Sequence, residues 1–321
     1  LTGMDVANAS MYDGASALAE AAQMASAVTG RAEWVVPRTL HPSYRETMRT
    51  YGWAAGCHLV ETPRRDVLAD VDEISSAVSS QTACIVVQQP NFFGYLEDAY
   101  RIGEIAHGAG ALLVACPDPV SLGLLRPPGE WGADICAAEG QALGIPQNFG
   151  GPLLGVFACR SEHLRRMPGR LVGATTDSDG RRGYTLTLQT REQHIRRERA
   201  TSNICTNQAL LALAATAHLC LLGKTGARRV AEACLRNAHY AARRICESGA
   251  CTLMPGRFFK EFVVKCGRPA AEIDAELREE GMVGGLDLGQ YYPEFADHIL
   301  ICVTEKRTRD EIDKLAKVMN G

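Results

Sequence analysis

Three glycine-rich segments of the sequence carry polar residues that could hold a small anion. Asp13 and Gly14 stand before a run of helix formers, whose first free N–H groups could cradle a phosphate. An Asn-Phe-Phe-Gly segment at 91–94 follows an apolar run, and residues 137–155 form a long glycine-dense loop. Alone, the first segment favours an ordinary capped helix and the second favours packed aromatic rings, whereas the third is typical of a loop with a constrained backbone.

The elements around these segments alternate between short apolar runs and helical patterns up to residue 159. This order predicts an α/β domain with a mostly parallel sheet, covered by helices on both faces. An Asp-Ser-Asp-Gly cluster at 177–180 predicts a hairpin or a mobile loop, and residues 207–249 predict a long helical stretch with a bend at 223–226. The remaining pattern is strand, helix, strand, helix. We therefore expect a large α/β domain at 1–227 and a small C-terminal α+β domain at 228–321.

The composition of the chain argues against nucleic acid, a membrane and a metal ion as partners. The 321 residues are 46% hydrophobic and carry a net charge of −3, so the chain can bury a full core and has no basic excess for nucleic acid. The apolar run 209–222 is shorter than the roughly 20 residues of a bilayer span, so we expect no membrane helix. The 12 cysteines are scattered singly, which favours reduced thiols over disulfides or zinc. We expect no metal site. We expect the protein to be located in a bacterial cytoplasm or, alternatively, in a mitochondrial matrix.

Several long segments together resemble one family. They are GMDVANASMYDGASALAEAA, QQPNFFGYLED, GADICAAEGQALGIPQNFGGP, RRERATSNICTNQALLALAA, GGLDLGQYYPE and HILICVTEKRTRDEID. The chain is similar to the P-protein (glycine decarboxylase) of the glycine cleavage system, and specifically to its non-catalytic α subunits, known as subunit 1. The resemblance implies the fold type I architecture of the pyridoxal-phosphate (PLP) transferases, the aspartate-aminotransferase relatives. Because the chain opens at Leu1 rather than Met, we expect it to be truncated at its N-terminus.

The resemblance also implies where the cofactor would be held. Catalytic relatives end the matching strand in a His-Lys pair, whose lysine forms a Schiff base with pyridoxal phosphate. Gly140 and Gln141 stand at these positions, and glutamine cannot form an imine. No lysine precedes Lys224, so the large domain offers no substitute. Catalytic relatives also place an aspartate against the pyridine nitrogen where this chain has Cys116, and Asp118 could replace it only after a shift of roughly 6 Å.

The enzyme implied by the resemblance consists of two kinds of subunit. A partner, glycine decarboxylase subunit 2 (β), would bind the pyridoxal phosphate in an α2β2 assembly. The complex would decarboxylate glycine and pass the aminomethyl group to the lipoyl group of H-protein. In this fold the loop before the long helix commonly reaches the cofactor phosphate of the other chain, and here that loop holds Thr201, Ser202 and Asn203. Capping of the helix that follows explains the same three residues equally well.

Other polar residues are more readily explained as scaffolding of interfaces or loops than as substrate contacts. They are Asn8, Ser10, Tyr12, Asn91, Gln141 and Asn148. The basic stretch with Arg191, Arg196, Arg197 and Arg199 could meet an acidic partner such as H-protein, although a solvated helical face is the simpler interpretation. Two further hypotheses stay open: a non-catalytic homodimeric binding module, and a fragment of a fused single-chain P-protein.

Overall fold

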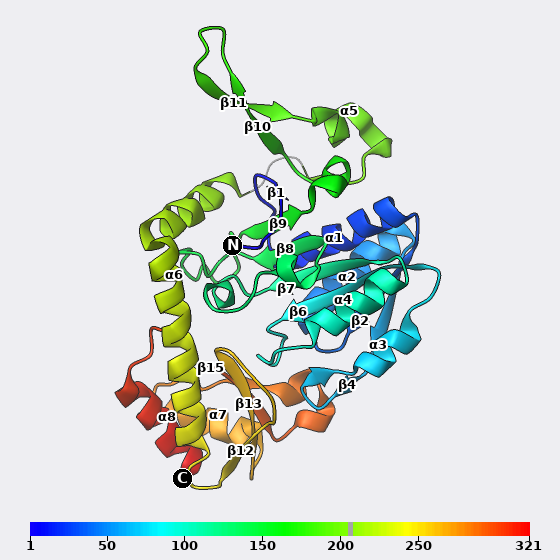
Figure 1. Cartoon of the computed structure of the whole chain (residues 1–321). Coiled ribbons are helices and arrows are strands. Elements are labelled where there is room, and N and C mark those ends of the chain that lie inside the picture. The colour runs from blue at the N-terminus through cyan, green and yellow to red at the C-terminus, as the bar shows by residue number, and fades with distance from the viewer. Residues whose placement is uncertain (205–207) are drawn as a thin grey trace.

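The computed structural model describes residues 1–204 and 208–321, and its centre is a seven-stranded sheet of order β1-β9-β8-β7-β6-β2-β3 (Figure 1). The strands are β1 (Val6–Ala7), β2 (Glu33–Pro37), β3 (His58–Thr62), β6 (Thr82–Gln89), β7 (Leu112–Pro117), β8 (Ile135–Glu139) and β9 (Gly155–Cys159). All neighbouring pairs from β3 to β8 are parallel, and β9 is antiparallel to both of its neighbours. The predicted, mostly parallel sheet is confirmed.

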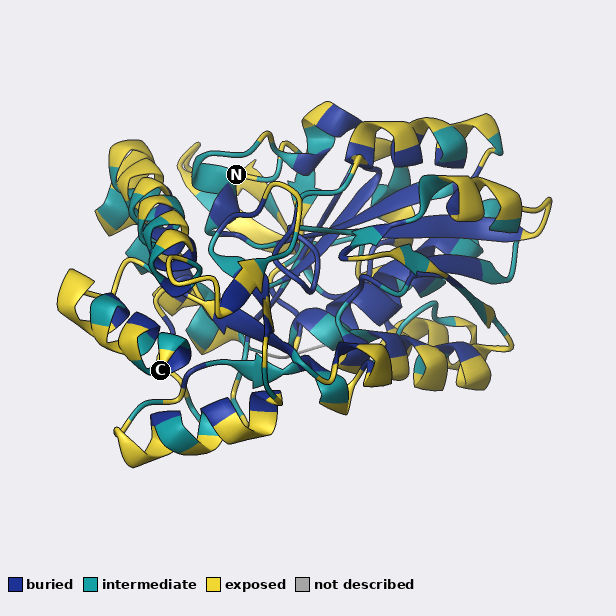
Figure 2. Ribbon diagram, turned by 90° about the horizontal axis from the view of Figure 1, so that it is seen from below, coloured by how far each residue is buried: buried dark blue, intermediate teal, exposed yellow. Residues whose placement is uncertain are grey.

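Helices cover both faces of this sheet. The first face carries α1 (Gly14–Thr29) and α2 (Pro42–Ala55), and the second carries α3 (Val71–Ala77) and α4 (Ala99–Gly108). Trp34 and Val36 of β2 belong to the core on the first face and Val35 to the core on the second, because successive side chains of a strand point to opposite faces. Figure 2 shows the result as buried strands enclosed by helices with exposed outer faces.

A hairpin projects from the body of the molecule (Figure 1). It pairs β10 (Leu171–Thr176) with β11 (Arg182–Thr187), and the Asp177 side chain accepts hydrogen bonds from two backbone N–H groups in the turn. The predicted hairpin is therefore confirmed. Large apolar side chains on it, Val172 and Tyr184, are exposed. Short helical turns follow, η4 (Gln189–Arg191), α5 (Gln193–Arg196) and η5 (Arg197–Arg199).

Helix α6 (Ala209–Ile245) runs along the side of the molecule to the C-terminal part (Figure 1). It bends at Gly223, whose φ of 57° and ψ of −178° are not helical, so the predicted bend is confirmed. Within the described residues, α6 is the one helix whose length and composition would suit a membrane crossing. The backbone at Gly223 separates the apolar run 209–222 from the second half of α6, and the expectation that the chain has no membrane helix stays a prediction.

The C-terminal part has its own sheet and core. The order β12-β13-β15-β14 joins β12 (Cys251–Leu253), β13 (Glu261–Cys266), β14 (Leu286–Asp287) and β15 (His298–Cys302) by antiparallel pairing. Helices α7 (Ala270–Glu279) and α8 (Arg309–Asn320) pack against it together with the second half of α6. The predicted strand–helix–strand–helix order is present, with β12 and β14 added. The boundary between 227 and 228 lies inside α6 and stays a prediction.

Candidate functional site

The start of helix α1 lies against the end of strand β8. Asp13 caps the helix, since its Oδ1 accepts a hydrogen bond from Ser16 N at 2.9 Å. Gly14 N donates a hydrogen bond to Glu139 Oε2, also at 2.9 Å. A Cβ atom at Gly14 would lie only 2.7 Å from Glu139 N and from the hydroxyl of Tyr44, so glycine alone allows this close approach. A carboxylate of the chain itself therefore occupies the anion-binding end of the helix.

The Glu139 carboxylate is held by three backbone groups. Besides Gly14 N on Oε2, its Oε1 accepts hydrogen bonds from Gln141 N at 2.9 Å and from Leu154 N at 3.3 Å. Burial raises the pKa of Glu139, although the three N–H groups favour its ionised form. The side chain of Gln141 folds back on its own loop, where Nε2 donates to the carbonyl oxygen of Pro146 at 3.4 Å. Gln141 follows the end of β8 as expected and offers no amine.

Strand β7 ends beside β8 and brings Cys116 and Asp118 to the same edge. Cys116 is buried in the core beneath α1. Asp118 Oδ1 accepts a hydrogen bond from Val120 N at 3.0 Å, and its Oδ2 lies 2.6 Å from Lys260 Nζ. Both charged side chains are largely buried, with exposed fractions of 19% for Asp118 and 15% for Lys260. The carboxylate at the end of this strand is therefore already paired with an internal cation.

Lys260 was missed by the sequence analysis because it comes from the C-terminal part, far along the chain from β7. Burial alone would lower its pKa, but the charges of Asp118 and Glu261 outweigh burial and raise the pKa of Lys260 above the ordinary value. A lysine amine reacts with carbonyl compounds only in its neutral form. The ion pair thus keeps Lys260 in its unreactive, charged form.

Two aromatic residues at the start of α2 stand near these charges. The His41 ring packs 5.0 Å from the Tyr44 ring and 4.9 Å from the Phe92 ring. Burial and the charge of Arg45 lower the pKa of His41 to about 4. Burial, followed by the nearby thiol and acidic groups, raises the pKa of Tyr44 well above its ordinary value. Both rings are neutral at physiological pH and cannot balance a charged ligand.

The described residues at this edge do not fit pyridoxal phosphate. Gln141 has no amine for a Schiff base, Glu139 fills the anion-binding end of α1, and Asp118 is neutralised by Lys260. The chain therefore carries no step of that cofactor's chemistry here. Glu139 is the last residue of strand β8 and precedes Gly140, and this position is the one sequence signal that could have identified it as a residue of the site.

The loop with the three predicted phosphate donors contacts α1 at Glu20. Ser202 Oγ accepts a hydrogen bond from Ile204 N at 3.1 Å and also bonds the Glu20 carboxylate. Glu20 is buried on α1, and burial raises its pKa to about 7 even though the Ser202 hydroxyl lowers it. Thr201, Ser202 and Asn203 line an open pocket of about 400 Å³. The Ser202 hydroxyl is thus engaged within the chain.

The alternative that these residues cap the following helix is wrong for α6. That helix begins at Ala209 with Gln208 as its N-cap residue, and no side chain makes a capping hydrogen bond there. Thr201 to Asn203 lie too far before this start to cap it. Residues 205–207, which include part of the same loop segment, lie outside the described residues.

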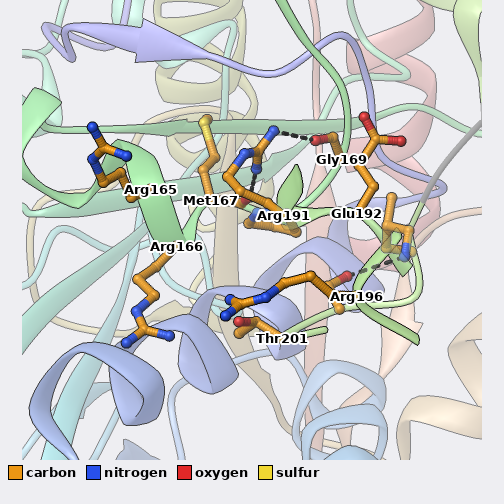
Figure 3. A pocket seen from close by; sticks show the side chains of 11 residues that line it. Arg165, Arg166, Met167, Gly169, Arg191, Glu192, Arg196 and Thr201 are labelled. Carbon is orange, nitrogen blue, oxygen red and sulfur yellow. Dashed lines mark hydrogen bonds between the residues drawn. The ribbon is translucent and has the colours of Figure 1, made fainter. Parts of the chain in front are cut away.

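Thr201 and Ser202 also border a small basic pocket (Figure 3), of about 10 Å³. Its lining includes Arg165, Arg166, Arg191 and Arg196. Arg191 donates hydrogen bonds to the backbone oxygens of Met167, Leu188 and Gly169, so it braces the chain from inside. The basic stretch is split over η4, α5 and η5, so its arginines do not share one helix. Arg196, Arg197 and Arg199 are nevertheless exposed, as the interpretation of a solvated face requires.

The asparagines predicted to act as scaffolds do hold loops. Asn91 is buried, and its Nδ2 donates to the Val67 carbonyl oxygen at 2.8 Å and to Glu97 Oε1 at 2.7 Å. Asn8 Nδ2 donates to the Pro168 carbonyl oxygen, and Asn148 Nδ2 to that of Pro152. Ser10 is buried and Tyr12 is exposed.

Among the described residues, one group has donor atoms close enough for a metal ion. Asp134, Glu162 and His163 offer atoms within 4.8 Å of one another. However, Asp134 Oδ2 already accepts hydrogen bonds from Leu113 N at 2.8 Å and lies 2.9 Å from His107 Nε2. This carboxylate has partners that stabilise it without a cation.

The architecture defines the class of protein as a fold type I relative of the PLP-dependent transferases. A solved sphingosine-1-phosphate lyase from Burkholderia pseudomallei K96243 shares the fold, with a TM-score of 0.67 at 18% identity, covering 96% of this chain and 68% of that chain. A crystal structure of glycine decarboxylase (P-protein) of the glycine cleavage system, in inhibitor-bound form, superposes with a TM-score of 0.94. It is 40% identical and covers 99% of this chain and 72% of that chain.

Sequence comparisons give the particular family. The model of the glycine cleavage system P-protein matches residues 1–319. The probable glycine dehydrogenase (decarboxylating) subunit 1 of Desulforamulus reducens is 55% identical over 98% of this chain and 71% of its own length. The corresponding subunit of Thermomicrobium roseum is 52% identical over 99% of this chain and 72% of its own length. The chain belongs to the glycine cleavage system P-protein family.

Proposed function

We propose that this chain is the subunit of a glycine dehydrogenase (decarboxylating) that holds no cofactor of its own and supports catalysis on a second subunit. The observation that carries the proposal is Gln141 at the end of β8, in a chain with no lysine before Lys224. Its relatives are named subunit 1, which implies a second subunit. On that subunit, pyridoxal phosphate would supply the electron sink for decarboxylation of glycine. The lipoyl group of H-protein would accept the aminomethyl group.

Uncovered apolar surface supports a partner. The inner face of the first half of α6 packs Leu211 and Ala215 against residues of the 143–154 segment. Its outer face leaves Leu210, Leu213 and Leu221 exposed by 76%, 65% and 88%. Monomeric proteins rarely leave such a row of leucines in water, whereas subunit interfaces use them. We assign this face and the apolar side chains of the β10–β11 hairpin to the contact with subunit 2, in an α2β2 assembly.

The Thr201 loop supports a contact with the partner's cofactor. Thr201 and Asn203 line an open pocket, and Thr201 also borders a pocket lined by several arginines. Hydroxyl, amide and guanidinium groups together suit a phosphate. Ser202 contributes less, because Glu20 already engages its hydroxyl. We therefore propose Thr201, with Asn203, as the principal donor toward the phosphate of the cofactor on subunit 2. We also propose that the complex is located in the bacterial cytoplasm, since the relatives compared above are bacterial.

The decisive experiment compares glycine–CO2 exchange, with H-protein present, for the chain alone and for the chain mixed with a lysine-bearing subunit 2. We expect exchange only in the mixture, because this chain lacks the Schiff-base amine. Exchange by the chain alone would contradict the proposal. Inactivity of both samples, with a subunit 2 that is active beside another subunit 1, would also contradict it and favour a binding module or a fragment of a fused P-protein.

A further inference from the structure

Two charged positions at the carboxyl edge of the central sheet are each matched by an opposite charge or a dipole from the same chain. At the end of β8, the Glu139 carboxylate lies on the N-terminus of α1, where the helix carries a partial positive charge. At the end of β7, the Asp118 carboxylate is paired with the Lys260 ammonium group at 2.6 Å. The first contact involves an anion and the second a cation, which are the two kinds of charge that a phosphorylated pyridinium ligand would bring.

We infer that this edge is a cofactor cup closed from within, in which Glu139 replaces a bound phosphate and Lys260 replaces a bound pyridinium. The inference deepens the proposed function and rests on it in one respect, the assignment of the chain to a cofactor-bearing fold. Each buried group that would otherwise require the ligand already has a partner of the correct sign.

The geometry at Glu139 argues for replacement rather than mere proximity. Gly14 N is the first free donor of a 16-residue helix, and its hydrogen bond to Glu139 Oε2 is 2.9 Å long. The backbone of Glu139 is so close that even a methyl group at Gly14 would lie 2.9 Å from its Cα. No phosphate can enter between the two elements while Glu139 keeps this position. Leu154 N and Gln141 N hold the other carboxylate oxygen in place.

At the second position, after the end of β7, the Lys260 ammonium group occupies the place beside Asp118 that a pyridinium would need. The lysine stands next to the first residue of β13, so the ion pair also fastens the C-terminal sheet to the central one. Glu261 and Asp118 both favour its charged form. Lys260 thus neutralises Asp118 and is itself withheld from reaction with an aldehyde.

The first test opens the cup at Glu139 in the full chain and uses inorganic phosphate as the probe. Any phosphate response at the arginine-lined Thr201 pocket is shared by every variant, so the quantity compared is the additional rise in melting temperature over that of the unaltered chain. For Glu139→Ala we expect a rise in melting temperature of about 1–2 °C once phosphate exceeds its dissociation constant about tenfold. Glu104→Ala is the matched control, because it removes an equal charge from an exposed position of α4 and leaves α1 intact. An equal response of Glu139→Ala and Glu104→Ala would overturn the inference.

The second test needs no variant and so remains decisive if Glu139→Ala fails to fold. The unaltered chain is treated with pyridoxal phosphate, reduced with borohydride and digested for mass spectrometry. We expect Lys260 to be modified at least about tenfold more slowly than Lys265, which lies on the same part of the chain with 57% of its side chain exposed. Preferential, saturable modification of Lys260 would show an open cup and overturn the inference. Neither result depends on subunit 2, so this inference and the proposed function can fail independently.

Discussion

The carboxyl edge of the central sheet and the outer surface of α6 differ in how their chemical groups are satisfied. At the sheet edge, Glu139, Asp118 and Lys260 are partly buried and all have partners within the chain. On α6, large leucine side chains face solvent without any cover in the described residues. The difference supports the proposal that the sheet edge needs no small ligand and that the outer face of α6 contacts another protein. The chain's contribution to catalysis is then a shaped surface rather than a reacting group.

The ion pair at the sheet edge allows the strongest test of this comparison. Lys260→Ala leaves Asp118 buried without its cation, and we expect a loss of about 3–5 kcal/mol in the free energy of unfolding. Urea denaturation measures the loss. Lys265→Ala serves as the control, because its pair with Asp297 is exposed and should contribute less than about 1 kcal/mol. Equal losses for the two variants would mean that the closed cup does not contribute to stability.

A buried acid of α1, Glu20, gives a prediction with a defined pH dependence. Glu20 has a pKa raised from 4.5 to about 7, so its protonated form is favoured by folding. The resulting stability is complete below pH 4.5 and is lost as the pH rises to about 7. We expect Glu20→Gln to match the unaltered chain near pH 4.5 and to be more stable by about 3 kcal/mol above pH 7. Chemical denaturation at both pH values checks the prediction, and a difference that does not vary with pH would contradict it.

The exposed leucines allow the opposite region to be tested. Leu213→Gln should weaken binding to subunit 2 about tenfold, or about 1.4 kcal/mol, and should leave the stability of the isolated chain within about 0.5 kcal/mol. Calorimetric titration with subunit 2 measures the affinity. Val283→Gln is a suitable control, since this side chain is even more exposed, at 90%, and comes from the segment between α7 and β14. Reduced stability without reduced affinity would show that this face is not the interface.

The smallest expected effect concerns the loop between the two regions. Thr201→Ala should lower the affinity of the assembled complex for pyridoxal phosphate about fivefold, equivalent to one hydrogen bond of about 1 kcal/mol. Ser202→Ala should change that affinity less, because its hydroxyl bonds Glu20 within the chain. Thr252→Ala, at an exposed position of β12 in the C-terminal sheet, is the control. Equal affinities for all three variants, from cofactor titration by fluorescence, would remove the loop from the site.

Much of the fold follows from local patterns in the sequence. Asp13 with Gly30 bounds α1, and the apolar runs of the parallel strands are readable because both faces of those strands are buried. The bend at Gly223 is signalled by its glycine. Strands β12 and β14 were not predicted, because two- and three-residue strands are fixed by pairing across the sheet rather than by their own composition.

The sequence alone determined that this chain cannot form a Schiff base in its large domain, since this follows from residue type: no lysine occurs before Lys224. Only the tertiary structure decided which groups of the chain pair with the N-terminus of α1 and with Asp118. Glu139 reaches Gly14, and Lys260 reaches Asp118, across separations of more than a hundred residues. Such pairs depend on the crossing of strands and helices in space, and no periodicity or spacing along the chain encodes them. The physical reason is that a buried charge selects its partner by distance and dielectric surroundings, which exist only after folding.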